Sequence, residues 1–197
     1  MMQMALRASK LANLHAWQPL GAVARGRMLE RGSCQCRDVP ADGNCLFTAI
    51  GRELAHKFPQ HPGLPANSQN GQVWQQFLLD YIAGTADGTS VRDWVTLLTG
   101  KTIPEYIRTL AHADDSSTWG GFMEASLIVN SWTRRTGAQL ACVLLRKCPD
   151  GDAQFFAWVG SREAGITIGA AWNGFHWVQA RMTNAAWVQA RAWALAP

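Results

Sequence analysis

The stretch Asp42-Gly43-Asn44-Cys45-Leu46-Phe47-Thr48-Ala49-Ile50 decides how the rest of this 197-residue chain is interpreted. Its first three residues are a strong turn signal. Apolar residues then recur every four positions, at Leu46, Ile50, Leu54 and Phe58. This spacing predicts a helix that begins at the cysteine. A helix N-terminus carries partial positive charge and unpaired N–H groups, so it is expected to lower the pKa of a thiol placed there.

Cys45 is therefore a candidate nucleophile. Gly43 allows a sharp backbone turn, so that the N–H groups of residues 42–45 can converge on one point. Such amides stabilise an oxyanion, and Gly43 and Asn44 are the candidate oxyanion loop. Cys142 lies inside an apolar run that predicts a buried strand, which indicates an inert core thiol.

A cysteine nucleophile needs a base that is distant in sequence and close in space. His176 lies between Phe175 and Trp177, at the start of the last predicted strand and just after the turn Asn173-Gly174. A strand start beside a turn can hold an imidazole in one orientation. The other histidines lie in the first helix, a helix end or loops: His15, His56, His61 and His112.

The order of predicted elements is helices first and strands last, which indicates an α+β or three-layer α/β-like architecture with a small central sheet flanked by helices. A short extended segment is expected at 34–39. Helices are predicted from Cys45, at 73–84, in two pieces at 94–111 and at 123–136, and strands at 139–146, 153–160, 165–170 and 175–181. The polar segment 84–93 is expected to lie outside them. The predicted units are a helical arm (1–31), a catalytic domain (32–182) and an Ala/Trp-rich tail (183–197).

The pentapeptide WVQAR occurs twice, at 177–181 and at 187–191. The first copy fits a strand, whereas the second lies in the Ala-rich tail and fits a helix. Two copies do not make a repeat protein.

The amino-acid composition excludes several classes of protein. A 48% hydrophobic and 16% charged content excludes a disordered polyelectrolyte, and a net charge of +4 without a dense basic block gives nucleic-acid binding no support. No apolar run reaches the ~20 residues of a membrane helix. The odd set Cys34, Cys36, Cys45, Cys142 and Cys148 is not a disulfide framework. It offers no zinc ligand spacing either, so reduced thiols, no metal and no cofactor are expected.

Three blocks in order resemble the OTU (ovarian tumour) cysteine proteases, a family of deubiquitinases. The stretch 42–50 is similar to their catalytic cysteine motif, Trp119-Gly120-Gly121-x-x-Glu124 resembles their second block, and Phe175-His176-Trp177 stands where the family has its histidine and an aromatic residue. The resemblance covers roughly residues 34–181.

The resemblance implies a papain-like OTU fold, ubiquitin or polyubiquitin chains as partners, and hydrolysis of isopeptide bonds at the C-terminal Gly of ubiquitin. Cys45 would form the thioester and His176 would transfer protons. Asp42 would shape the oxyanion loop and is counted with the catalytic residues. A narrow channel for the Gly-Gly tail is expected from Trp119, Gly120, Gly121 and Trp177.

One position departs from the family pattern. Many OTU enzymes carry Asp or Asn two residues after the histidine to orient its ring, and here that residue is Val178. The orienting residue could instead be Asn173, Asp38 or Asp42. The site could also lack a third residue, because a Cys–His dyad meets the basic chemical need.

Two alternatives follow. The first is a catalytically weak ubiquitin-binding module, which Val178 favours. The second is a thiol hydrolase that uses Cys45 and His176 on another ubiquitin-like modifier or on a peptide. A monomer is expected, in a reducing cytoplasm. The Ala, Arg and Trp content of a short chain suits a bacterial effector delivered into a host cell. The arm 1–31 is expected to pack beside the ubiquitin site or to stabilise the fold.

Overall fold

A computed structural model describes residues 27–67, 70–84, 88–111, 120–147, 153–161 and 163–195. Most of the predicted arm, residues 1–26, lies outside these ranges, as does Trp119.

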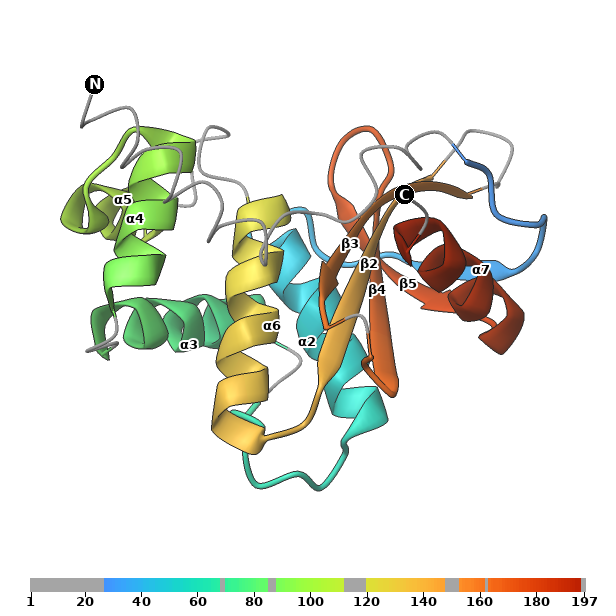
Figure 1. Ribbon diagram of the computed structural model, residues 1–197, viewed down its shortest axis with the longest axis horizontal. Coiled ribbons are helices and arrows are strands. Elements are labelled where there is room, and N and C mark those ends of the chain that lie inside the picture. Colours follow the sequence, from blue (N-terminus) through green and yellow to red (C-terminus); the bar gives the residue numbers. More distant parts are fainter. Residues whose placement is uncertain are drawn as a thin grey trace.

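A five-stranded mixed sheet forms the centre of the molecule, with the strand order β1-β5-β4-β2-β3 (Figure 1). The strands are β1 (Cys34–Arg37), β2 (Leu140–Lys147), β3 (Ala153–Gly160), β4 (Ile166–Trp172) and β5 (Trp177–Met182). β2 runs parallel to β4, and the other neighbours are antiparallel. The order brings the first described strand beside the last.

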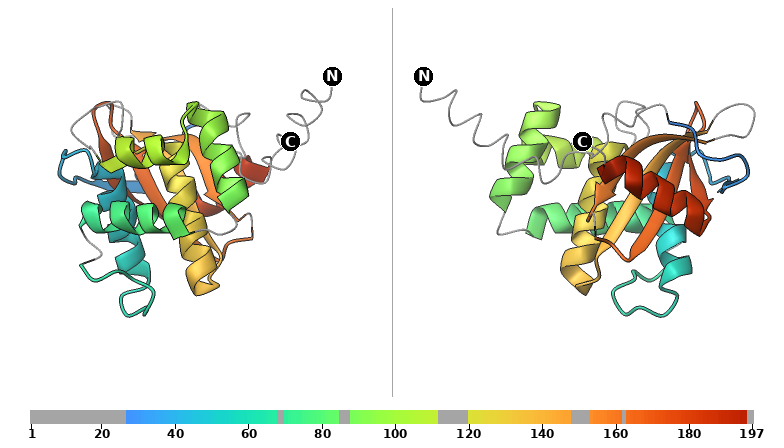
Figure 2. Two further views of the ribbon diagram at one scale, coloured as in Figure 1. Left: turned by 90° about the vertical axis from the view of Figure 1, so that its left-hand side faces the viewer. Right: turned by 45° about the vertical axis from the view of Figure 1, so that its right-hand side comes forward.

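Helices cover both faces of this sheet. They are α2 (Cys45–Lys57), α3 (Gly71–Gly84), α4 (Gly88–Thr99), α5 (Ile103–Ala111), α6 (Phe122–Thr136) and α7 (Asn184–Leu195). Figures 1 and 2 show α2 and α6 against one face and α7 against the other. The predicted α+β architecture with a central sheet between helical layers is confirmed.

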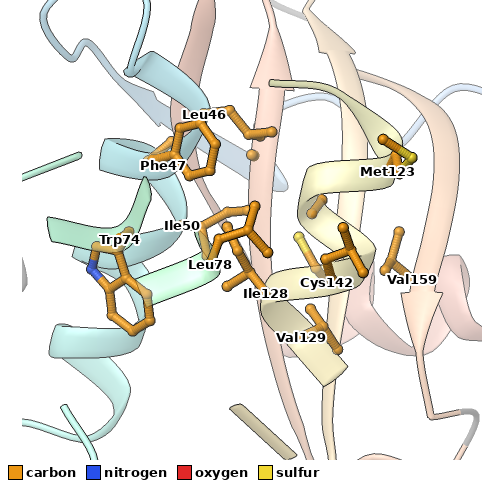
Figure 3. Packing of buried hydrophobic residues seen from close by; sticks show 14 of the residues in the cluster. Leu46, Phe47, Ile50, Trp74, Leu78, Met123, Ile128, Val129, Cys142 and Val159 are labelled. Carbon is orange, nitrogen blue, oxygen red and sulfur yellow. The ribbon is translucent and has the colours of Figure 1, made fainter. Parts of the chain in front are cut away.

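Each face of the sheet has its own core. Along β2, Cys142 and Leu144 belong to the cluster under α2 and α6, whereas Val143 and Leu145 belong to the cluster under α7. Side chains alternate between the faces of a strand, so a strand covered on both sides needs an unbroken apolar run. Figure 3 shows the first cluster, where Ile50 of α2 and Leu78 of α3 lie beside Ile128 of α6.

The first described helix begins at Cys45 as predicted, and α6 ends at Gly137, which has φ 72°. The prediction for 84–93 was wrong in part, because α4 begins at Gly88. Val91 and Val95 are buried in the main core, and this burial outweighs the weak helix propensity of the Gly- and Asp-rich segment.

The two WVQAR copies adopt different structures, as predicted: the first forms most of β5 and the second lies within α7. In α7, Ala186, Trp187, Ala190 and Ala194 are buried. The C-terminal segment is thus part of the second core.

Candidate active site

The nucleophile candidate Cys45 is placed by the turn that precedes α2. Gly43 has φ 76°, in the left-handed region that favours glycine. The Asn44 N–H donates to Asp42 Oδ1 over 3.0 Å, which closes the turn. Asp42 therefore acts on the shape of this loop, and the Asn44 amide is already engaged within it.

Cys45 is buried, with only 2% of the residue's surface exposed. The backbone N–H of Trp177 donates to Cys45 Sγ over 3.4 Å, across the interface between α2 and β5. Burial raises the pKa of the Cys45 thiol above its usual value, the N–H groups of Trp177 and Leu46 oppose this rise, and the charge of Asp42 adds to it. The helix N-terminus alone predicts the opposite direction, but desolvation is larger, so the protonated thiol is favoured.

The base candidate His176 lies on the turn between β4 and β5. Asn173 Oδ1 accepts from the N–H groups of Phe175 and His176, both at 2.9 Å, and so shapes this turn. The ring Nε2 of His176 lies 2.7 Å from Asp38 Oδ1. A carboxylate on Nε2 selects the tautomer with Nε2–H, which leaves Nδ1 without a proton. Asn173 Nδ2 lies 3.5 Å from that Nδ1.

Asp38 belongs to the link between β1 and α2. β1 pairs with β5 so that Arg37 faces Gln179, and the same register continued by one residue places Asp38 opposite Val178. Val178 itself is 3% exposed and packs in the core under α7. The carboxylate on the His176 ring thus comes from the neighbouring segment instead of from the strand that follows the histidine.

Cys45 and His176 are held near each other through Trp177, the next residue in the chain. Within the described ranges, the hydrogen bonds of Cys45 Sγ do not include the His176 ring. Catalytic hydrogen bonds are often long in unliganded enzymes and tighten with substrate.

The loop before α6 contacts Trp177. The Trp177 indole N–H donates to the Gly120 carbonyl over 2.8 Å, and the Gly121 N–H donates to Glu124 Oε2 over 2.6 Å. A Cβ on Gly120 would lie 2.9 Å from Leu46 Cδ2, so glycine permits the loop to contact the start of α2. The loop that contains Gly120 and Gly121 therefore contacts both α2 and β5.

Tyr106 was not found from the sequence. Its hydroxyl donates to Glu124 Oε1 in the core, and burial followed by the Glu124 charge raises the Tyr106 pKa. One carboxylate thereby joins α5 to the Gly120–Gly121 loop. Only the position of Glu124 in its motif could have indicated this role.

A hollow of about 340 Å³ lies beside Trp177. Its lining is Leu145, Arg146, Gln154, Phe155, Phe156, Trp172 and Trp177. Phe175, next to the candidate base, is 80% exposed. Neither Cys45 nor His176 is among the lining residues, and of the residues predicted to form a channel only Trp177 is.

Over the ranges that the structure describes, no group of three or more His, Cys, Asp or Glu side chains could hold a metal ion. In the same ranges, no helix has the length and apolar character to cross a membrane.

The sequence matches no known family profile, and no curated protein matches it. Solved structures do match the fold. The Hazara virus OTU bound to ubiquitin has a TM-score of 0.52 at 15% identity, over 87% of this chain and 98% of that one. The viral OTU domain protease from Taggert virus has a TM-score of 0.53 at 15% identity, over 85% and 93%. An OTU deubiquitinase from Wolbachia pipientis has 0.51 at 8% identity, over 81% and 98%.

Proposed function

We propose that this chain, which has the OTU fold, is a cysteine deubiquitinase that hydrolyses isopeptide bonds at the C-terminal Gly of ubiquitin. One observation carries the proposal: a thiol at a helix N-terminus lies against the N–H of the residue that follows an Asp-paired histidine. The fold neighbours support the substrate class, since one is bound to ubiquitin and another is called a deubiquitinase.

The arrangement supplies each role of a thiol hydrolase. With Nε2 of His176 held by Asp38, Nδ1 takes the proton of Cys45, and the thiolate attacks the glycine carbonyl carbon. The N–H groups at the start of α2 stabilise the oxyanion. Nδ1 then gives its proton to the leaving lysine amine, which leaves a thioester on Cys45.

Water completes the reaction. His176 takes a proton from water as the water attacks the thioester carbonyl, and it returns the proton to the departing sulfur. The products are the free carboxylate of ubiquitin and the Cys45 thiol. Because burial favours the neutral thiol, proton transfer to His176 is part of the catalytic step in this scheme.

The test is incubation with ubiquitin that carries a C-terminal electrophile, followed by intact mass measurement. We expect one covalent adduct, lost in Cys45→Ala and strongly reduced in His176→Ala. A folded chain that binds ubiquitin without an adduct would instead be a binding module. An adduct with a different modifier, and none with ubiquitin, would support a hydrolase of that modifier.

A further inference from the structure

We infer that Arg52 is a positioning residue, whose guanidinium fixes the backbone at Asp38 and thereby the carboxylate that orients His176. The catalytic consequence of this inference rests on the proposed function, whereas the structural consequence rests on the contacts alone.

Asp38 needs such support because its side chain is 80% exposed. An exposed ion pair contributes only about 0–1 kcal/mol, because water screens the charges and both side chains lose rotamer freedom. The attraction between Asp38 and His176 is thus too weak to fix the ring unless the Asp38 backbone is already in place.

The backbone around Asp38 is held at three points. β1 ends one residue earlier, at Arg37, and Val39 is buried in the main core at 5% exposure. Between them, the Asp38 carbonyl accepts a hydrogen bond from Arg52 Nη1 over 3.1 Å. Arg52 therefore acts at the residue whose side chain meets the imidazole.

Arg52 lies on the same helix as the nucleophile. It comes seven residues after Cys45, which is two helical turns and about 10 Å along the axis. Cys45 contacts the Trp177 amide, His176 contacts Asp38, and the Asp38 carbonyl contacts Arg52. This chain of contacts begins and ends on α2. The Asp38 backbone therefore cannot move relative to the Cys45 thiol without breaking one of these contacts.

The guanidinium is partly buried. Arg52 Nε is buried and has no hydrogen-bond partner among the residues that the structure describes, whereas Nη1 reaches the Asp38 carbonyl. The planar guanidinium fixes Nη1 relative to the rest of the group, whereas a lysine ammonium is a single donor group on a flexible stem. We therefore expect Arg52→Lys to retain an intermediate effect.

The first experiment compares Arg52→Gln with Arg37→Gln, using a fluorogenic ubiquitin substrate. Arg37 is an exposed cation next to Asp38 in sequence, so its variant removes the same charge without the bond to the Asp38 carbonyl. We expect about a tenfold fall in kcat for Arg52→Gln, a smaller fall for Arg52→Lys, and unchanged KM in both. A loss confined to KM would make Arg52 a substrate contact and overturn the inference.

A double-mutant cycle tests whether Arg52 acts through Asp38. In an Asp38→Ala background, Arg52→Gln should cost less than twofold, because the carboxylate that it positions is gone. A full tenfold loss in that background would overturn the inference.

The structural readout needs no activity. In a Cys45→Ala background under alkaline conditions, the ¹⁵N shifts of the His176 ring report which nitrogen carries the proton. Arg52→Gln should shift the tautomer population toward that of Asp38→Ala, and Arg37→Gln should leave it unchanged. An unchanged ring in Arg52→Gln would refute the positioning role even if the chain had no activity on ubiquitin, so the two failures are distinguishable.

Discussion

Removal of the Glu53 side chain should strongly destabilise the fold, whereas its amide replacement should not. Glu53 is fully buried on α2. Its Oε1 accepts from Gln179 Nε2 over 2.5 Å and from Arg181 Nη2 over 3.3 Å, both on β5. Glu53 Oε2 and Gln179 Oε1 are buried without a partner among the described residues.

The expected cost of Glu53→Ala has two parts. The substitution leaves the Gln179 amide N–H buried and unpaired, at about 1–3 kcal/mol, and removes one buried methylene at about 0.8 kcal/mol. Arg181 is 47% exposed, so water replaces most of what its ion pair contributes. Loss of an incompletely satisfied carboxylate offsets part of this cost, so the net cost should be about 2 kcal/mol. Glu53→Gln keeps the acceptor for the Gln179 amide and removes a buried charge, so we expect a cost of about 1 kcal/mol or less.

Urea unfolding followed by circular dichroism measures both values, and thermal unfolding should show a Tm lower by about 6 °C for Glu53→Ala. Glu163→Ala is the control, since that carboxylate is exposed and its loss should leave the free energy of unfolding unchanged. The reasoning is refuted if Glu53→Ala costs less than about 1 kcal/mol, or if Glu53→Gln is as costly as the alanine variant.

Three further outcomes are expected. Gly43→Ala forces φ 76° on a side chain and should cost about 1–2 kcal/mol in thermal unfolding, whereas Gly165→Ala, at an ordinary φ with open space around it, should be neutral. Asp42→Asn keeps the turn acceptor but removes a charge that raises the Cys45 pKa, so iodoacetamide should modify that thiol faster at neutral pH; an equal or slower rate would contradict this. Burial, and then a neighbouring carboxylate, raise the Cys142 pKa, so the folded state keeps a proton that the unfolded thiol loses above about pH 8.5. Stability should then fall as pH rises past that value, and Cys142→Ala should reduce the slope by up to about 1.4 kcal/mol per pH unit in urea titrations; identical slopes would be the contrary result.

Local patterns predicted most of the elements, because turn residues and apolar spacing act over a few positions. The helix at Cys45 and the end of α6 at Gly137 were predicted for this reason. The start of α4 was missed because burial of Val91 in the core, and not propensity, decides it.

The site depends more on register than on local sequence. Asp38 stood among several candidates for the third residue, since only the pairing of β1 with β5 shows that it meets the imidazole. The direction of the Cys45 pKa also needed the fold, because burial by distant segments outweighs the helix N-terminus. Arg52 and Tyr106 carry no motif, and their contacts cross 14 and 18 residues.

The pairing of β1 with β5 also sets when a newly made chain can act. Asp38 and Cys45 are synthesised early, but His176 lies 138 residues after Asp38, on the turn before β5. Proteins emerge from the ribosome N-terminus first, so a nascent chain carries the candidate nucleophile Cys45 long before the candidate base His176 exists. If the chain has the proposed activity, it should therefore be inert throughout most of its own synthesis, and truncated products that lack the final strand should have no proteolytic activity.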